Sequence, residues 1–399
     1  MTRVARAAAI VALAGCAGGA AAPDAPGSLR AGGARREAPA PRRRDARVDR
    51  AMQEMSHVRE LSVVRDVSGE VVSRDALMRE LRAHVDREVP RAEIDAERTF
   101  LTALGVIAPD EDYERETYAA VRRAAGGMYL PEKQTMFLPD DLGGASLATS
   151  LAHEAVHALQ DQHFGLEAFE RYAPGAGDAM LARSCLAEGD ATSATEEEPL
   201  PADDASYVER ELAAPYAFGT AFVRALRARG GWAEVDRAWT RGDLTTEQVL
   251  HPDKWAGDEP ALAVPEPTFR TLGSSFARTA ADTHGELGLL LLLEAGVPAA
   301  RAAQGASGWG GDRSVSASDG ARTAIAWRVR WDDDASARRG FEIVRAAFAN
   351  GRTCRDERSS PLAVTRDGRD ALVLVGPKGS SCALLEAWSK EVFAGEALP

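Results

Sequence analysis

Two histidines and a glutamate near the middle of the chain have the spacing of a metal-binding pair with an adjoining base. In His153-Glu154-Ala155-Val156-His157, the imidazoles stand at i and i+4, one turn apart on one face of a helix. Two neutral imidazoles so placed can hold one Zn²⁺ at about 2.0–2.1 Å. Zinc lowers the pKa of a bound water to about 7, and Glu154 is positioned to take its proton. The pattern predicts hydrolysis by zinc-activated water.

A catalytic zinc needs a third protein ligand and one open position. The best candidate is Glu188, in Leu186-Ala187-Glu188-Gly189-Asp190, which lies 188 − 157 = 31 residues beyond His157. It falls on the next predicted helix, and two neighbouring antiparallel helices can place it opposite the histidine pair. We therefore expect His153, His157 and Glu188 to hold the metal.

His-Glu-x-x-His is the zincin signature, and with Glu188 the sequence resembles the gluzincin metallopeptidases, the thermolysin-like class. More closely, residues 153–164 with Glu188-Gly189-Asp190-Ala191 resemble a group of largely uncharacterised bacterial exported proteins. Residues 245–252 and 308–313 are further marks of that group, and the resemblance covers about residues 128–312. It implies a zinc-dependent hydrolase of peptide or protein substrates, with Glu154 as the catalytic base.

The resemblance also implies residues around the metal. Thermolysin-like enzymes often carry an Asp one turn after the Glu ligand, and here that position is Thr192. We expect Asp190, or Asp161 one turn beyond His157, to orient a ligand histidine instead.

Gluzincins also use a His or Tyr to stabilise the oxyanion, and Tyr216, His251 and His284 are the candidates. As alternatives, His251 caps the end of a helix, and His284 and Tyr216 are ordinary packing residues.

Two other interpretations of the motif stay open. The histidines can be partly buried hydrogen-bonding residues without a metal, although apolar cores rarely take two His and a Glu unpaired. Alternatively, the protein is a non-hydrolytic, zinc-bearing envelope lipoprotein that acts as a binding or assembly module. The presence of Glu154 favours the enzyme, because a purely structural zinc site does not need that carboxylate.

Helical periodicity predicts the elements that position these residues. The motif lies in a predicted helix over residues 145–163, and Glu188 lies in one over 178–195. A strand, turn and strand over 128–138 precede them, where a zincin has its substrate-aligning edge strand. Further helices are expected over residues 74–88, 91–105, 110–126, 205–229, 232–241, 285–295, 335–350 and 382–393, and strands over 323–331, 361–365 and 371–375.

The predicted fold class is α+β, mainly α. It consists of a zincin-like helical domain over residues 51–305 with a short β-hairpin, and a small α+β domain over 306–399.

The N-terminus has the features of an export signal. Arg3 and Arg6 precede a short apolar stretch, and Leu13-Ala14-Gly15-Cys16 resembles a bacterial lipoprotein cleavage site. The resemblance implies that residues 1–15 are removed and that Cys16 carries lipid. Residues 16–50, rich in Ala, Gly, Pro and Arg, are expected to form a disordered tether. The predicted location is the bacterial cell envelope, on the periplasmic or surface face of the outer membrane.

Composition limits the possible partners. The chain has 399 residues, with 48 Lys and Arg against 61 Asp and Glu, giving a net charge of −13. Such an acidic chain is a poor candidate for general nucleic-acid binding. The sequence has no apolar run of eighteen residues, so we expect membrane contact through the lipid anchor only. Cys354 and Cys382 can pair in an oxidising compartment, which leaves Cys185 as a free thiol. The sequence does not fix the oligomeric state.

Overall fold

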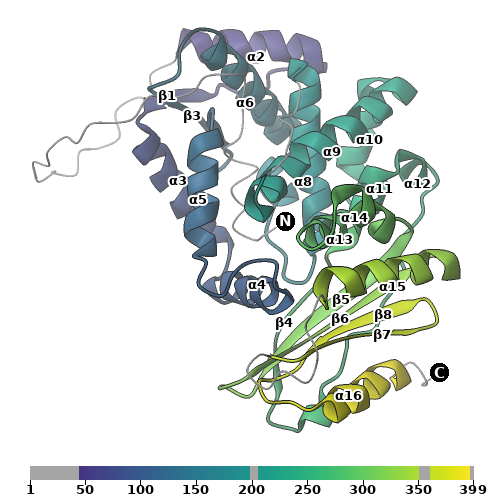
Figure 1. Cartoon of the computed structure of the whole chain (residues 1–399). Coiled ribbons are helices and arrows are strands. Elements are labelled where there is room, and N and C mark those ends of the chain that lie inside the picture. The colour runs from purple at the N-terminus through teal and green to yellow at the C-terminus, as the bar shows by residue number, and fades with distance from the viewer. Residues whose placement is uncertain (1–44, 198–204, 350–359, 396–399) are drawn as a thin grey trace, which may run out of the picture.

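The computed structural model describes residues 45–197, 205–349 and 360–395, and Figure 1 shows their arrangement. The predicted signal peptide, the lipidated Cys16, most of the predicted tether and Cys354 lie outside the described residues. The described chain is α+β and mainly helical, which confirms the predicted fold class. The described helices are α2 (Ala46–Arg59), α3 (Arg74–Glu88), α4 (Arg91–Leu104), α5 (Tyr113–Ala124), α6 (Gly144–Phe164), α7 (Leu166–Phe169), α8 (Gly177–Thr195), α9 (Tyr207–Gly230), α10 (Trp232–Arg241), α11 (Thr246–Leu250), α12 (Pro252–Ala256), α13 (Gly285–Glu294), α14 (Ala299–Ala306), α15 (Asp334–Phe348) and α16 (Cys382–Ala394), together with the 3₁₀ helix η1 (Arg270–Leu272).

The strands form two sheets. In the first, β1 (Ser68–Val72) pairs parallel to β3 (Thr135–Pro139), and β2 (Met128–Leu130) pairs antiparallel to the other edge of β3. The second sheet has the order β4-β5-β6-β8-β7 and is antiparallel throughout. Its strands are β4 (Ala277–Asp282), β5 (Trp309–Ser318), β6 (Thr323–Trp331), β7 (Leu362–Asp367) and β8 (Asp370–Val375).

The five-stranded sheet lies below the helical part in Figure 1, with α15 on one face and α16 on the other. Successive side chains of β6 point to opposite faces of the sheet, and both sets are apolar, which explains why a helix covers each face. Ile325, Trp327 and Val329 join the main hydrophobic core, whereas Ala324 and Ala326 pack with Trp388 of α16.

Helix α8 lies at the centre of the helical part, because nearly all of its residues are buried. Its small residues allow α9 to approach it closely. A Cβ added to Gly219 of α9 would lie 1.9 Å from the carbonyl oxygen of Cys185, and one added to Gly189 of α8 would lie 2.1 Å from the carbonyl carbon of Gly219. Only glycine permits this contact between the two backbones, one residue away from Glu188.

Two boundaries differ from the sequence predictions. Asp45 caps α2, which begins at Ala46, so the end of the predicted tether, residues 46–50, is helical. Strand β4 pairs with β5, so the C-terminal sheet begins ahead of residue 306, where the sequence had placed the start of the second domain.

None of the helices among the described residues is long and apolar enough to span a bilayer. Cys185 is a buried free thiol, and Cys382 is disulfide-bonded.

The crossing of α8 and α9 gives a test of stability. We expect Gly219→Ala to lower the free energy of unfolding by about 2–4 kcal/mol, because the added methyl group forces the two backbones apart. Gly395→Ala is the control, since its backbone is helical and the nearest atoms to an added Cβ are 3.5 Å away. Urea unfolding of both variants is the measurement, and equal midpoints for the two would contradict the close crossing.

Candidate metal centre

Helices α6 and α8 bring together the three side chains expected to hold a metal. The rings of His153 and His157 have their centroids 4.8 Å apart. Oε2 of Glu188 lies 3.1 Å from Nε2 of His153 and 3.4 Å from Nε2 of His157. Ligand atoms from the three residues all lie within 4.8 Å of one another. Tetrahedral ligands with bonds of 2.0–2.2 Å stand about 3.4 Å apart, so this spacing suits a zinc ion.

The cluster is buried and strongly polarised. Burial alone would raise the pKa of Glu188, but the imidazoles of His157 and His153 lower it to about 2. Burial would lower the pKa of His153, yet its contacts with the carboxylates of Glu188 and Glu197 raise it to about 10. The site therefore favours a carboxylate with positive charge beside it, which either protons or a metal cation can supply.

Glu154 lies beside this cluster and is only 1% exposed. Burial raises its pKa to about 7, against the opposing effect of the two imidazoles, and the backbone amide of Tyr129 in β2 hydrogen-bonds to its carboxylate. A Cβ added to Gly127 would lie 3.2 Å from Oε1 of Glu154, so glycine leaves the space that this carboxylate occupies. A carboxylate with a pKa near neutrality suits proton transfer at neutral pH.

The residues that orient the histidines were not predicted from the sequence. Nδ1 of His157 donates to Oε1 of Gln160, 2.8 Å away, and Nε2 of Gln160 donates to the carbonyl oxygen of Ala187 at 3.0 Å. Gln160 thus ties the His157 ring to the backbone next to Glu188. Its position three residues after His157, on the same helix face, was the signal that could have identified it.

A second carboxylate approaches the other histidine. Oε1 of Glu197, just beyond α8, lies 3.4 Å from Nδ1 of His153 and accepts a hydrogen bond from the hydroxyl of Thr195 at 2.7 Å. No local sequence pattern indicates this contact, because it depends on how the chain leaves α8.

The prediction that Asp190 or Asp161 orients a ligand histidine is wrong. Asp190 accepts from Nε of Arg59 at 2.6 Å and from Nε1 of Trp239 at 2.9 Å. Two residues along a helix amount to about 200° of rotation, so Asp190 points away from the side of α8 that carries Glu188. Asp161 accepts from the hydroxyl of Tyr129 at 2.9 Å and pairs with Arg65.

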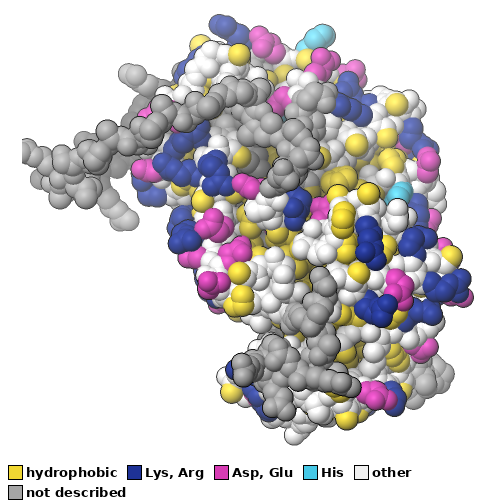
Figure 2. Space-filling model, in the orientation of Figure 1, with side chains coloured by type: hydrophobic (Ala, Val, Ile, Leu, Met, Phe, Trp, Pro, Cys, Tyr) yellow, Lys and Arg dark blue, Asp and Glu magenta, His cyan; other side chains and the backbone are white. Residues whose placement is uncertain are grey.

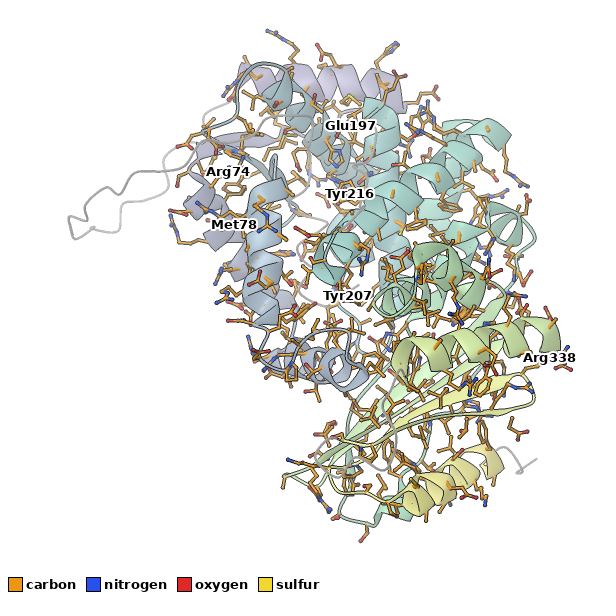
Figure 3. The ribbon with its side chains drawn as sticks, viewed as in Figure 1. Arg74, Met78, Glu197, Tyr207, Tyr216 and Arg338 are labelled. Atoms are coloured by element: carbon orange, nitrogen blue, oxygen red, sulfur yellow. The ribbon has the colours of Figure 1, made fainter. Side chains whose placement is uncertain are left out.

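Of the three oxyanion candidates, Tyr216 lies beside the metal cluster. The centroid of its ring lies 6.1 Å from that of His153, and Figure 3 labels Tyr216 just below Glu197. His251 instead pairs through Nε2 with Glu286 at 3.0 Å. His284 stacks on Phe100 and bonds Ser314 through Nε2 at 2.9 Å, so these contacts favour the structural alternatives for both histidines.

A second acidic cluster is already neutralised by a lysine. Nζ of Lys254 lies 2.6 Å from Glu247, 2.7 Å from Glu259 and 2.8 Å from Asp332. The ammonium group occupies the position that a metal ion would need, so we assign no metal to these carboxylates.

Comparison with known proteins is informative for the C-terminal sheet only. Residues 270–390 match a family model described as Domain of unknown function (DUF8575), which is under a third of the chain. The match begins at η1 and ends in α16, so it contains none of the residues of the candidate metal centre. Neither the curated proteins nor the solved structures provide a match to this chain.

Removal of the amide that holds His157 should weaken metal binding. We expect Gln160→Ala to lower zinc affinity by about 10–100-fold, because the ring loses the acceptor that fixes its orientation. Competition with a chromogenic chelator measures the affinity. Gln162→Ala is the control on the same helix, since Gln162 bonds the backbone of Val64 and Arg65 instead. Equal zinc affinity in both variants would show that Gln160 does not position the ligand.

Proposed function

We propose that the protein is a zinc-dependent peptide hydrolase in which His153, His157 and Glu188 hold the ion and Glu154 is the general base. The observation that carries the proposal is the buried carboxylate of Glu154 next to the three-residue cluster. Burying the carboxylate of Glu154 to this degree lowers the stability of the fold. A zinc site with a purely structural role does not need this carboxylate, whereas a hydrolytic site uses it as the base.

The donor set fits zinc in three respects. It consists of two imidazole nitrogens and a carboxylate oxygen, which are common zinc ligands, and the spacing of their atoms suits tetrahedral bonds. Oε1 of Glu188 and Oε2 of Glu154 are buried without a hydrogen-bond partner among the described residues. Unpaired buried oxygens of this kind indicate that a cation or a water belongs beside them.

The chain's own residues have separate roles in this proposal. Zinc supplies Lewis acidity, which polarises a carbonyl oxygen and lowers the pKa of a water to about 7. Glu154 accepts the proton of the attacking water and returns it to the leaving amine. The hydroxyl of Tyr216 is the donor we propose for the developing oxyanion. Gln160 holds the imidazole of His157 in the orientation that binding requires, and the carboxylate of Glu197 lies 3.4 Å from Nδ1 of His153 and favours positive charge on the cluster.

The lipoprotein signal adds a location to the proposal. Cleavage before Cys16 and lipidation of that residue would tether the folded part to the cell envelope, where peptides or proteins of the envelope are the substrates. This part rests on the sequence alone, since residues 1–44 lie outside the described residues.

Glu154→Gln tests the proposed chemistry most simply. The variant should keep about one zinc per chain, since Glu154 is not a ligand, whereas cleavage of a peptide library should fall by about 10²–10⁴-fold. His153→Ala should lose both zinc and cleavage. Glu167→Gln on α7, an exposed glutamate, should change neither.

The measurements are metal analysis by mass spectrometry and product analysis of the digested library. Bound zinc without cleavage of any library peptide would support the alternative, a non-hydrolytic envelope binding or assembly module. Absence of zinc from a chain loaded with excess metal would refute both.

A further inference from the structure

Tyr129 contacts helix α6 at two points, through its backbone and through its side chain. Its backbone amide hydrogen-bonds to the carboxylate of Glu154, and its hydroxyl donates to Oδ2 of Asp161 at 2.9 Å. Glu154 and Asp161 are two turns apart on α6, so they share one face of the helix and stand about 10 Å apart along its axis. Tyr129 therefore joins strand β2 to α6 at two places on the face that carries the base.

The segment that leads into β2 lies directly against the base. A Cβ added to Gly127 would stand 3.2 Å from both Cγ and Oε1 of Glu154. Oε2 of Glu154 has no hydrogen-bond partner among the described residues, so the amide of Tyr129 holds one oxygen of the carboxylate and leaves the other for a proton. A shift of β2 would move this amide and change the direction in which the carboxylate points.

Strand β2 depends on α6 for support along one edge. It is three residues long and pairs with β3 along its other edge. The side chain of Tyr129 is buried, and burial together with the negative charge of Asp161 raises the pKa of its hydroxyl. The phenol therefore stays protonated and remains a hydrogen-bond donor to Asp161 at neutral pH.

A partly buried ion pair holds the acceptor of this hydrogen bond. Figure 2 shows charged side chains of both signs mixed over the visible outer surface, where water and salt weaken ion pairs. Asp161 pairs with Arg65, and its side chain is only 8% exposed, so this pair is screened less. Oε1 of Gln162 accepts from the amide of Arg65 at 3.1 Å, and its Nε2 donates to the carbonyl oxygen of Arg65 at 3.1 Å. Asp161 thus has a fixed position to which the phenol is attached.

We propose that Tyr129 is a positioning residue for the base, because its hydroxyl anchors β2 to Asp161 and its backbone amide thereby holds the carboxylate of Glu154 in one orientation. The inference rests on the proposed function for the role of Glu154 in catalysis, but the anchoring of β2 can be measured without catalysis.

Tyr129→Phe removes the hydroxyl and keeps the ring. In the zinc-loaded full chain, kcat for a library peptide that the wild type cleaves should fall about tenfold, because a small misplacement of a catalytic group slows the reaction. KM and zinc affinity should stay within about twofold, since no ligand or substrate contact is removed. Tyr118→Phe is the matched control, because Tyr118 is also buried but lies on α5 beneath the guanidinium of Arg82. It should change none of these quantities.

A double-variant cycle tests whether the hydroxyl acts through Asp161. The kcat of Tyr129→Phe combined with Asp161→Ala should equal that of Asp161→Ala alone, because the two side chains act as one unit. Losses of kcat that multiply in the double variant, or an unchanged kcat in Tyr129→Phe, would overturn the inference. A fall in zinc affinity as large as the fall in kcat would also overturn it, since Tyr129 would then act on the metal ligands.

Hydrogen exchange separates this inference from the proposed function. Mass spectrometry should find that the amides of residues 128–130 exchange about tenfold faster in Tyr129→Phe than in the wild type. An unchanged exchange rate overturns the anchoring while the hydrolase stands. Faster exchange in a chain whose wild type cleaves no peptide overturns the hydrolase, and Tyr129 then fixes the carboxylate of Glu154 without a catalytic role.

Discussion

The candidate site depends on the close crossing of α8 and α9. Gly189 and Gly219 let the two backbones touch, and Glu188 precedes Gly189 directly. A helix that is buried on all sides and locked against its neighbour has little freedom to rotate or slide. The position of the third ligand relative to the histidines of α6 is therefore set by backbone packing before any metal is considered.

A buried ion pair holds the opposite side of α8. The guanidinium of Arg59, at the end of α2, donates to Asp190 and also to Asp236 at 2.6 Å, and it lies 4.4 Å from the centre of the Trp232 ring. Because Asp190 points away from Glu188, this network fixes the rotation of α8 from behind. The α2 helix, which the sequence had partly assigned to the tether, thus belongs to the support of the site.

Local patterns predicted much of this structure. The helices that carry the motif and Glu188 begin and end within a residue of the predicted bounds. Gly165, which ends α6 in the left-handed conformation, is a local stop signal of this kind. The two histidines lie close together on α6 as their spacing predicts, and Glu188 of α8 meets them. The parallel pairing of β1 with β3, the pairing of β4 with β5, and the roles of Arg59 and Glu197 were not foreseen. Each depends on residues far apart in the chain, and neither periodicity nor spacing reports such contacts. The contact of Gln160 with His157 is different, because the two residues are three positions apart on one helix and this spacing could have predicted it.

The central claim is that one ion is held by two imidazoles and one carboxylate at this junction of helices. X-ray absorption at the zinc K-edge of the zinc-loaded full chain tests it most directly. The account predicts a first shell of nitrogen and oxygen atoms only, at about 2.0–2.2 Å, with the outer-shell scattering of two imidazole rings. A sulfur ligand at about 2.3 Å, or a chain that retains no zinc, would contradict it.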